Sequence, residues 1–223
     1  MKSLLVFAPS RADDEHRRGA LERTRWIAEQ TLTMLQSEAD WTPVPLLDTA
    51  ATRPGLANAV ESGVAGAVFC VHGRRNQNPT LGDDALLGDD GEPALDRDNV
   101  AVFAGAWIHA VACRAAEGLG PLAIHAGVEC FAGYRGALLV EWSPSELPDP
   151  IREVFCRLVV STTRLLARGE RSEVALCRAA QTLADNVESW FLEQPDADSS
   201  WILFAQQLAR VCLLLPANQA STG

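Results

Sequence analysis

Residues 65–73 read AGAVFCVHG, a short apolar run that ends in His72 and Gly73. A continuous apolar run of this length is typical of a strand that is buried on both faces of a sheet. Residues 3–8 (SLLVFA) and 107–112 (WIHAVA) have a similar character, and helical stretches are expected between these runs. The alternation predicts an α/β fold with a mostly parallel sheet, flanked by helices and joined by right-handed crossovers.

Composition limits the class of protein and of partner. The 223 residues are 48 % hydrophobic and 22 % charged, which is enough for one sizeable core. The net charge is -10 and Lys2 is the only lysine, so we expect no nucleic-acid partner, because a nucleic-acid groove must neutralise many phosphates. No apolar run approaches the ~20 residues of a membrane span, and the N-terminal one is too short for a signal peptide. We therefore expect a cytoplasmic protein without a membrane partner.

The six cysteines are scattered and show no CxxC spacing. This pattern favours reduced thiols in a cytosolic protein over disulfides or a zinc site. The acidic stretch 74–98 is predicted to be a solvated loop, because it lacks the ligand spacing of a calcium-binding loop.

We predict an α/β core over residues 1–142 and a helical C-terminal segment, residues 143–223, that packs on the same domain. The elements expected in the core, besides the runs above, are helices over 21–36, 55–62 and 99–105 and from Gly120, and strands over 44–47, 128–131 and 137–142. In the C-terminal segment we expect helices over 151–167, 172–192 and 199–215, with no strand between them.

Two residues with catalytic chemistry follow apolar strands. His72 and Cys113 should emerge at the same edge of the sheet, because functional groups gather at the carboxyl ends of parallel strands. A thiol beside an imidazole is an activated nucleophile, so we expect Cys113 to be alkylated fastest of the six thiols. His109 is expected ~13 Å from Cys113 along the same strand, which is too far for a hydrogen bond, and His125 is expected on the next helix. His16, in the loop after the first strand, remains a competing base.

Several motifs carry a family resemblance, which extends over residues 3–184. They are a strand ending in His72-Gly73, Asp90-Gly91 in the following loop, a strand ending in Ala112-Cys113, the segment Phe131-Ala132-Gly133-Tyr134, and Leu165 to Gly169 before an alanine-rich helix. With these motifs the chain resembles the caspase-like cysteine peptidases, which include caspases, metacaspases and bacterial proteases with a CHAT domain.

The resemblance implies a caspase-like fold and a cysteine endopeptidase. Cys113 would be the nucleophile and His72 the general base and acid, and the backbone N–H groups of Gly73 and Cys113 would form the oxyanion hole. It implies a protein or peptide substrate, an activating protein partner, no metal or organic cofactor, and a place in bacterial stress or defence signalling.

The substrate pocket departs from the family pattern at Val111, which is apolar where caspases and metacaspases carry a polar or acidic residue. A charge for the pocket must then come from the loop after the first strand. There Asp13 or Asp14 would select a basic P1 residue and Arg11 an aspartate, whereas a pocket with none of them would be apolar. We rank a basic P1 first and an apolar P1 second.

Two other functions compete with the peptidase hypothesis. The first is a catalytically inactive caspase-like interaction module, against which the presence of both His72 and Cys113 argues. The second is an unrelated α/β domain that binds a nucleotide, which is disfavoured because no glycine-rich phosphate loop follows the first strand.

Overall fold

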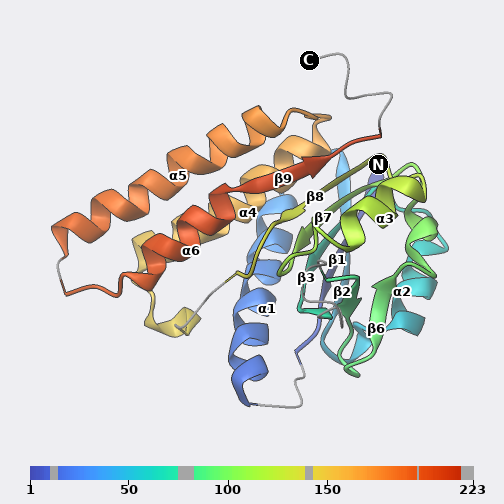
Figure 1. The fold of residues 1–223 in the computed structure, drawn as a ribbon, viewed down its shortest axis with the longest axis horizontal. Helices are drawn as coiled ribbons and strands as arrows, with labels where there is room; N and C mark the ends of the chain where they lie inside the picture. The colour runs from blue at the N-terminus through green and yellow to red at the C-terminus, as the bar shows by residue number, and fades with distance from the viewer. Residues whose placement is uncertain (11–14, 75–82, 139–142, 195, 217–223) are drawn as a thin grey trace.

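The computed structural model describes residues 1–10, 15–74, 83–138, 143–194 and 196–216. A six-stranded sheet lies at its centre, with the strand order β2-β1-β3-β7-β8-β9 (Figure 1). The strands are β1 (Lys2–Ala8), β2 (Trp41–Leu47), β3 (Gly66–Cys70), β7 (Trp107–Val111), β8 (Cys130–Tyr134) and β9 (Val211–Leu214). All neighbouring pairs are parallel except β8 with β9, so the expected mostly parallel α/β sheet is confirmed.

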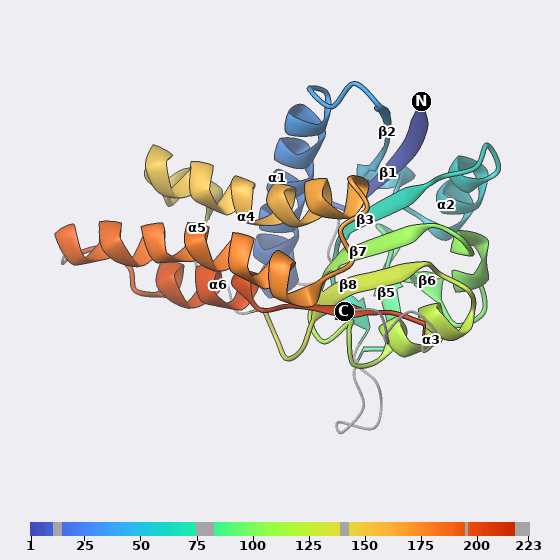
Figure 2. The same cartoon turned by 90° about the horizontal axis from the view of Figure 1, so that it is seen from above.

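Each face of the sheet is covered by its own helices, and side chains alternate between the two faces. Along β1, Leu4 and Val6 belong to one buried cluster, and Leu5 and Phe7 belong to the other. The helices on the first face are α1 (Glu15–Leu35), α4 (Asp149–Ala167), α5 (Glu173–Glu193) and α6 (Ser200–Ala209) (Figure 2). Those on the second face are α2 (Arg53–Val60), α3 (Leu119–His125) and the short 3-10 helix η2 (Val100–Phe103).

The helix expected over residues 199–215 ends at Ala209, and the rest of that segment is strand β9. The expected extent of this last helix was therefore wrong, whereas the described residues hold no strand between α4, α5 and α6, as expected. A short apolar run such as Val211–Leu214 fits either a helix or a strand by its pattern alone. Here it pairs with β8 along the partly exposed edge of the sheet, from Phe131 with Leu214 to Tyr134 with Val211.

The stretch 74–98 is not only loop, as the sequence had suggested. It holds β5 (Ala85–Leu87) and β6 (Pro93–Asp96), which form a small antiparallel sheet with β4 (Gly73–Arg74). Three of its acidic side chains are buried: Asp83, Asp89 and Asp96. Strands of two to four residues are too short to show alternation, which explains the error.

Three boundaries also differ from expectation. Helix α1 begins at Glu15, so His16 lies in its first turn and not in a loop. Strand β8 starts at Cys130 and extends to Tyr134. Of the strand expected over residues 137–142, the first two residues have no regular structure and the other four lie outside the described residues. None of the helices in the described part of the chain is long and apolar enough to cross a membrane.

A buried histidine ties the sheet to helix α4. His109 Nδ1 lies 3.0 Å from Thr163 Oγ1, and its Nε2 lies 3.3 Å from the Tyr134 hydroxyl. Burial lowers the pKa of His109 to about 3, so its ring stays neutral in the folded protein. Above the pKa that His109 has in the unfolded chain, the neutral ring costs no stability. As the pH falls below that value, the unfolded chain binds a proton on His109 that the folded protein does not bind, so the free energy of unfolding decreases.

We expect this histidine to remove about 1.4 kcal/mol of stability for each pH unit below ~6.5. Urea unfolding of the wild type and of His109→Gln between pH 7.5 and 5 measures the effect. Glutamine keeps hydrogen-bonding atoms but does not titrate, so the variant should lose less stability on acidification. An equal loss in both proteins would contradict the assignment.

Candidate active site

The strand register brings His72 and Cys113 to the same edge of the sheet. Cys70 on β3 pairs with Val111 on β7, and each candidate lies two residues beyond its member of that pair. The backbone N–H of Val71 donates to the carbonyl oxygen of Val111 at 3.3 Å, so the chains still run together past the strands. His72 and Cys113 therefore occupy equivalent positions, each two residues past the paired ends of the neighbouring parallel strands β3 and β7.

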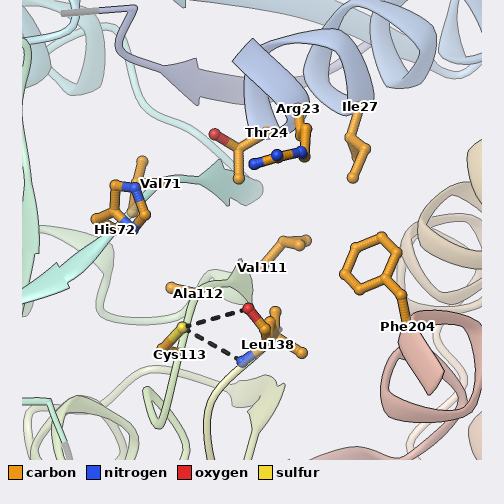
Figure 3. Close-up of a pocket in the computed structure, with 10 residues that line it drawn as sticks. All are labelled: Arg23, Thr24, Ile27, Val71, His72, Val111, Ala112, Cys113, Leu138 and Phe204. Atoms are coloured by element: carbon orange, nitrogen blue, oxygen red, sulfur yellow. Dashed lines mark hydrogen bonds between the residues drawn. The ribbon is translucent and has the colours of Figure 1, made fainter. Parts of the chain in front are cut away.

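Both side chains line one cavity of about 60 Å³ at this carboxyl edge (Figure 3). The remaining lining residues come from α1, from the two strand ends, from the segment after β8 and from α6: Arg23, Thr24, Ile27, Val71, Val111, Ala112, Leu138 and Phe204. Most of this wall is apolar. A cavity of this size holds part of one side chain, so a longer peptide would extend outside it.

The backbone around Cys113 fixes the position of the sulfur. The next residue, Arg114, has a φ of 49°, a left-handed conformation that is uncommon outside glycine. Its N–H donates to the carbonyl oxygen of Gly136 at 2.8 Å, which ties this sharp turn to the segment after β8. From the same segment the N–H of Leu138 donates to Cys113 Sγ at 3.3 Å.

Cys113 is a neutral thiol at rest. Burial raises its pKa above the ordinary value, and the Leu138 N–H acts in the opposite direction because it favours the thiolate. The charge of Asp83 raises the pKa further. The structure thus gives no support to a permanently ionised Cys113, and the proton must leave the sulfur during any reaction.

Gly73 is required by the close approach of Asp83. A Cβ at position 73 would come within 2.7 Å of Asp83 Cβ and nearer still to a carboxylate oxygen. The Asp83 side chain, which is only 5 % exposed, therefore packs directly against the peptide that follows His72. The N–H of Leu87 donates to the His72 carbonyl oxygen at 3.0 Å. Hydrogen-bonded and non-hydrogen-bonded pairs alternate along an antiparallel ladder, so the next pair, Gly73 with Leu86, is a non-hydrogen-bonded one. The N–H of Gly73 therefore points away from β5.

Of the other expected site residues, the structure places only some near the cavity. Val111 lines the cavity. Arg11, Asp13 and Asp14 lie outside the described residues, and the side chain of His16 does so too. His125 is at the end of α3 that leads back to the start of β8, on the opposite edge from Cys113. Within the described residues no cluster of three or more histidine, cysteine or acidic side chains is arranged to hold a metal ion.

Sequence reasoning missed three features of this site: Arg23, Asp83 and the N–H of Leu138. Arg23 lies on the helix expected over residues 21–36, and the sequence does not indicate which strand ends this helix faces. Asp83 is one of seven acidic residues in a stretch that was taken for solvated loop. The contact of Leu138 is made by its backbone, which no side-chain pattern can indicate.

The chain matches no family model, and a search of curated proteins finds no similar sequence. Any functional assignment therefore rests on the residues and their geometry.

Thiol reactivity gives a first test of the site. Cys70, Cys130 and Cys156 are buried and burial raises the pKa of each to about 12, whereas Cys177 and Cys212 are half-exposed like Cys113. Exposure therefore distinguishes Cys113 from the three buried thiols but not from Cys177 and Cys212. Since the thiolate is the reactive form, iodoacetamide labelling of Cys113 should rise about tenfold per pH unit from pH 7 to 9. A rate that is already constant below pH 8 would instead show a preformed thiolate–imidazolium pair.

Proposed function

We propose that this protein is a cysteine endopeptidase in which Cys113 and His72 form the catalytic dyad. The observation that carries this proposal is that both side chains line one cavity, from equivalent positions just past two adjacent parallel strands. A thiol nucleophile beside an imidazole base is the minimal apparatus for acyl transfer from an amide.

The proposed reaction has two half-reactions. In the first, Cys113 Sγ attacks the scissile carbonyl carbon while a ring nitrogen of His72 accepts the thiol proton. The tetrahedral intermediate collapses to a thioester, and His72 returns the proton to the leaving amine. In the second, His72 takes a proton from water, the hydroxyl attacks the thioester, and the acid product leaves as the thiol regains its proton. The raised pKa of Cys113 fits proton transfer that accompanies attack.

Two backbone N–H groups are proposed to stabilise the oxyanion, those of Gly73 and Cys113. The ladder geometry turns the Gly73 N–H away from β5, and a donor of this kind contributes ~3 kcal/mol to lowering the barrier. The charge of Asp83 beside this peptide would favour the imidazolium that forms on His72 in the transition state. Asp83 is thus a positioning residue in this scheme.

The motifs His72-Gly73 and Ala112-Cys113 support membership of the caspase-like peptidases, with a protein or peptide substrate. A cytoplasmic location, an activating partner and a role in bacterial stress or defence signalling belong to the same proposal and come from the resemblance alone.

A catalytically inactive interaction module is the second candidate. The observation that favours it is the thiol of Cys113, whose pKa is raised and not lowered. The two candidates differ in one measurement, the cleavage of a mixed peptide library followed by mass spectrometry. We expect the wild type to generate new termini that Cys113→Ala does not generate, whereas an interaction module would leave the library intact in both cases.

A further inference from the structure

The cavity beside His72 and Cys113 has a wall that belongs mostly to the hydrophobic core. Six of its ten described lining residues have apolar side chains: Ile27, Val71, Val111, Ala112, Leu138 and Phe204. All of these except Leu138 are at most 2 % exposed. In Figure 3 Phe204 lies on the opposite side of the cavity from His72, and Val111 lies between them. The cavity therefore extends from the proposed dyad toward an apolar end at Phe204.

The ring of Phe204 is held in place by the core behind it. It packs against the ring of Phe155 on α4, with the centroids 5.4 Å apart and an edge-to-face angle of 88°. Both rings belong to the same buried cluster, so Phe204 cannot move aside without opening a void there. Phe204 also lies on α6, beyond residues 3–184, to which the family resemblance extends. The closed end of the cavity is thus built by a helix outside the resemblance.

The two polar side chains that α1 contributes to the wall already interact with other groups of the protein. Thr24 Oγ1 donates to the carbonyl oxygen of Leu21 at 3.1 Å. Burial lowers the pKa of Arg23, and the charges of Glu22 and Glu146 act on its guanidinium in the opposite direction. A charged substrate side chain that reached the apolar end would lose its water without gaining a counter-charge, which costs binding energy.

We propose that this cavity receives an aliphatic P1 side chain, such as leucine, and that Phe204 limits the size of that side chain. The inference rests on the proposed peptidase function and adds its substrate class and a specificity-determining residue. The cavity volume of about 60 Å³ is far below the ~150 Å³ of an apolar cavity that binds benzene, so an aromatic P1 side chain exceeds the space. This assignment reverses the ranking made from the sequence, which placed a basic P1 first.

A set of fluorogenic peptides that differ only at P1 tests the proposal, with Ala, Leu, Phe, Asp or Lys at that position. For the wild type we expect kcat/KM for Leu to exceed that for Ala by about 10- to 100-fold, because Leu fills the apolar end. Asp has nearly the shape of Leu but carries a charge, so kcat/KM for Asp, and likewise for Lys, should be about 100-fold or more below that for Leu. The Phe peptide should be about tenfold or more below Leu for lack of space.

Shortening Phe204 should move the preference toward larger P1 side chains. In Phe204→Ala the ratio of kcat/KM for Phe to that for Leu should rise about tenfold or more, and in Phe204→Leu it should rise less, because fewer atoms are removed from the closed end. Both peptides are measured on the same protein sample, so the ratio does not depend on the fraction of folded enzyme. Phe204→Leu keeps the test valid if Phe204→Ala does not fold.

Phe103→Leu is the matched control. It makes the same change at a phenylalanine that is fully buried on the second face of the sheet and does not line the cavity. This variant should lose stability as Phe204→Leu does, which thermal melting measures, but its ratio of kcat/KM for Phe to that for Leu should equal that of the wild type. A changed ratio in the control would mean that loosening of the core alters P1 preference without Phe204, which would contradict the assignment.

The outcomes separate this inference from the function on which it rests. Fastest cleavage after Asp or Lys, absent in Cys113→Ala, would overturn the aliphatic pocket and leave the peptidase intact. An unchanged ratio in the folded Phe204 variants would show that Phe204 does not limit P1. A wild type that cleaves none of the five peptides and, like Cys113→Ala, leaves a mixed peptide library intact would overturn the peptidase and the pocket together.

Discussion

Replacing Cys113 or His72 by alanine should each lower kcat/KM for a cleaved peptide by about 10³-fold or more. The double variant should be no slower than the slower single variant. The reason is that the thiol without its base, or the base without its nucleophile, contributes almost nothing to acyl transfer, so the two losses do not add. Steady-state rates of the four proteins on one fluorogenic peptide measure the effect.

Cys212→Ala is the matched control, because Cys212 is also a half-exposed thiol but lies on β9 outside the cavity. It should retain wild-type turnover. Both active-site variants should keep the wild-type melting temperature within a few degrees, since neither side chain belongs to a buried cluster. If His72→Ala kept near-normal turnover while His16→Ala lost it, His16 would be the base and the dyad as proposed would be wrong.

Gly73→Ala should cost about 10²-fold in kcat while leaving the protein folded, which is the loss typical of one oxyanion donor. The added methyl group would come within 2.7 Å of Asp83 Cβ, so either the peptide after His72 or the Asp83 side chain must move. Movement of the peptide misdirects both the His72 ring and the Gly73 N–H. Single-turnover kinetics with a fluorogenic peptide, together with thermal melting, separates this effect from lost stability.

The companion variant Asp83→Gly tests the cause of that loss. It removes the three Asp83 atoms that a Cβ at position 73 would meet. Adding Gly73→Ala to the Asp83→Gly background should therefore cost much less than adding it to the wild type. An equal cost in both backgrounds would show that the methyl group acts without Asp83, and full activity of Gly73→Ala would remove Gly73 from the oxyanion hole.

The sequence was sufficient for the parallel sheet because its buried strands are continuous apolar runs. Residues 65–71 and 107–112 could be recognised in this way. Strand β3 is the first run without its first and last residues, and β7 is the second run without its last residue. The shared edge of His72 and Cys113 followed from the same two runs, because parallel neighbours end on the same side.

The rest required long-range contacts that local pattern does not encode. Val211–Leu214 is a strand only because β8 lies beside it. The contact of Asp83 with Gly73 joins residues that lie ten positions apart in the sequence. Arg23 was overlooked as a pocket residue because the sheet edge that it faces is formed by residues 71 and 111, far along the chain.

The central claim, that His72 activates Cys113 toward a bound acyl group, is tested most directly by covalent trapping. The protein is incubated at neutral pH with peptidyl acyloxymethyl ketones that carry Asp, Leu or Lys at P1, and the thioether is mapped by mass spectrometry. We predict one adduct per chain, at Cys113, and its loss in His72→Ala, because a thiol with a raised pKa needs the imidazole to take its proton. Labelling spread over Cys177 and Cys212, or labelling of Cys113 that is equally fast without His72, would contradict the dyad.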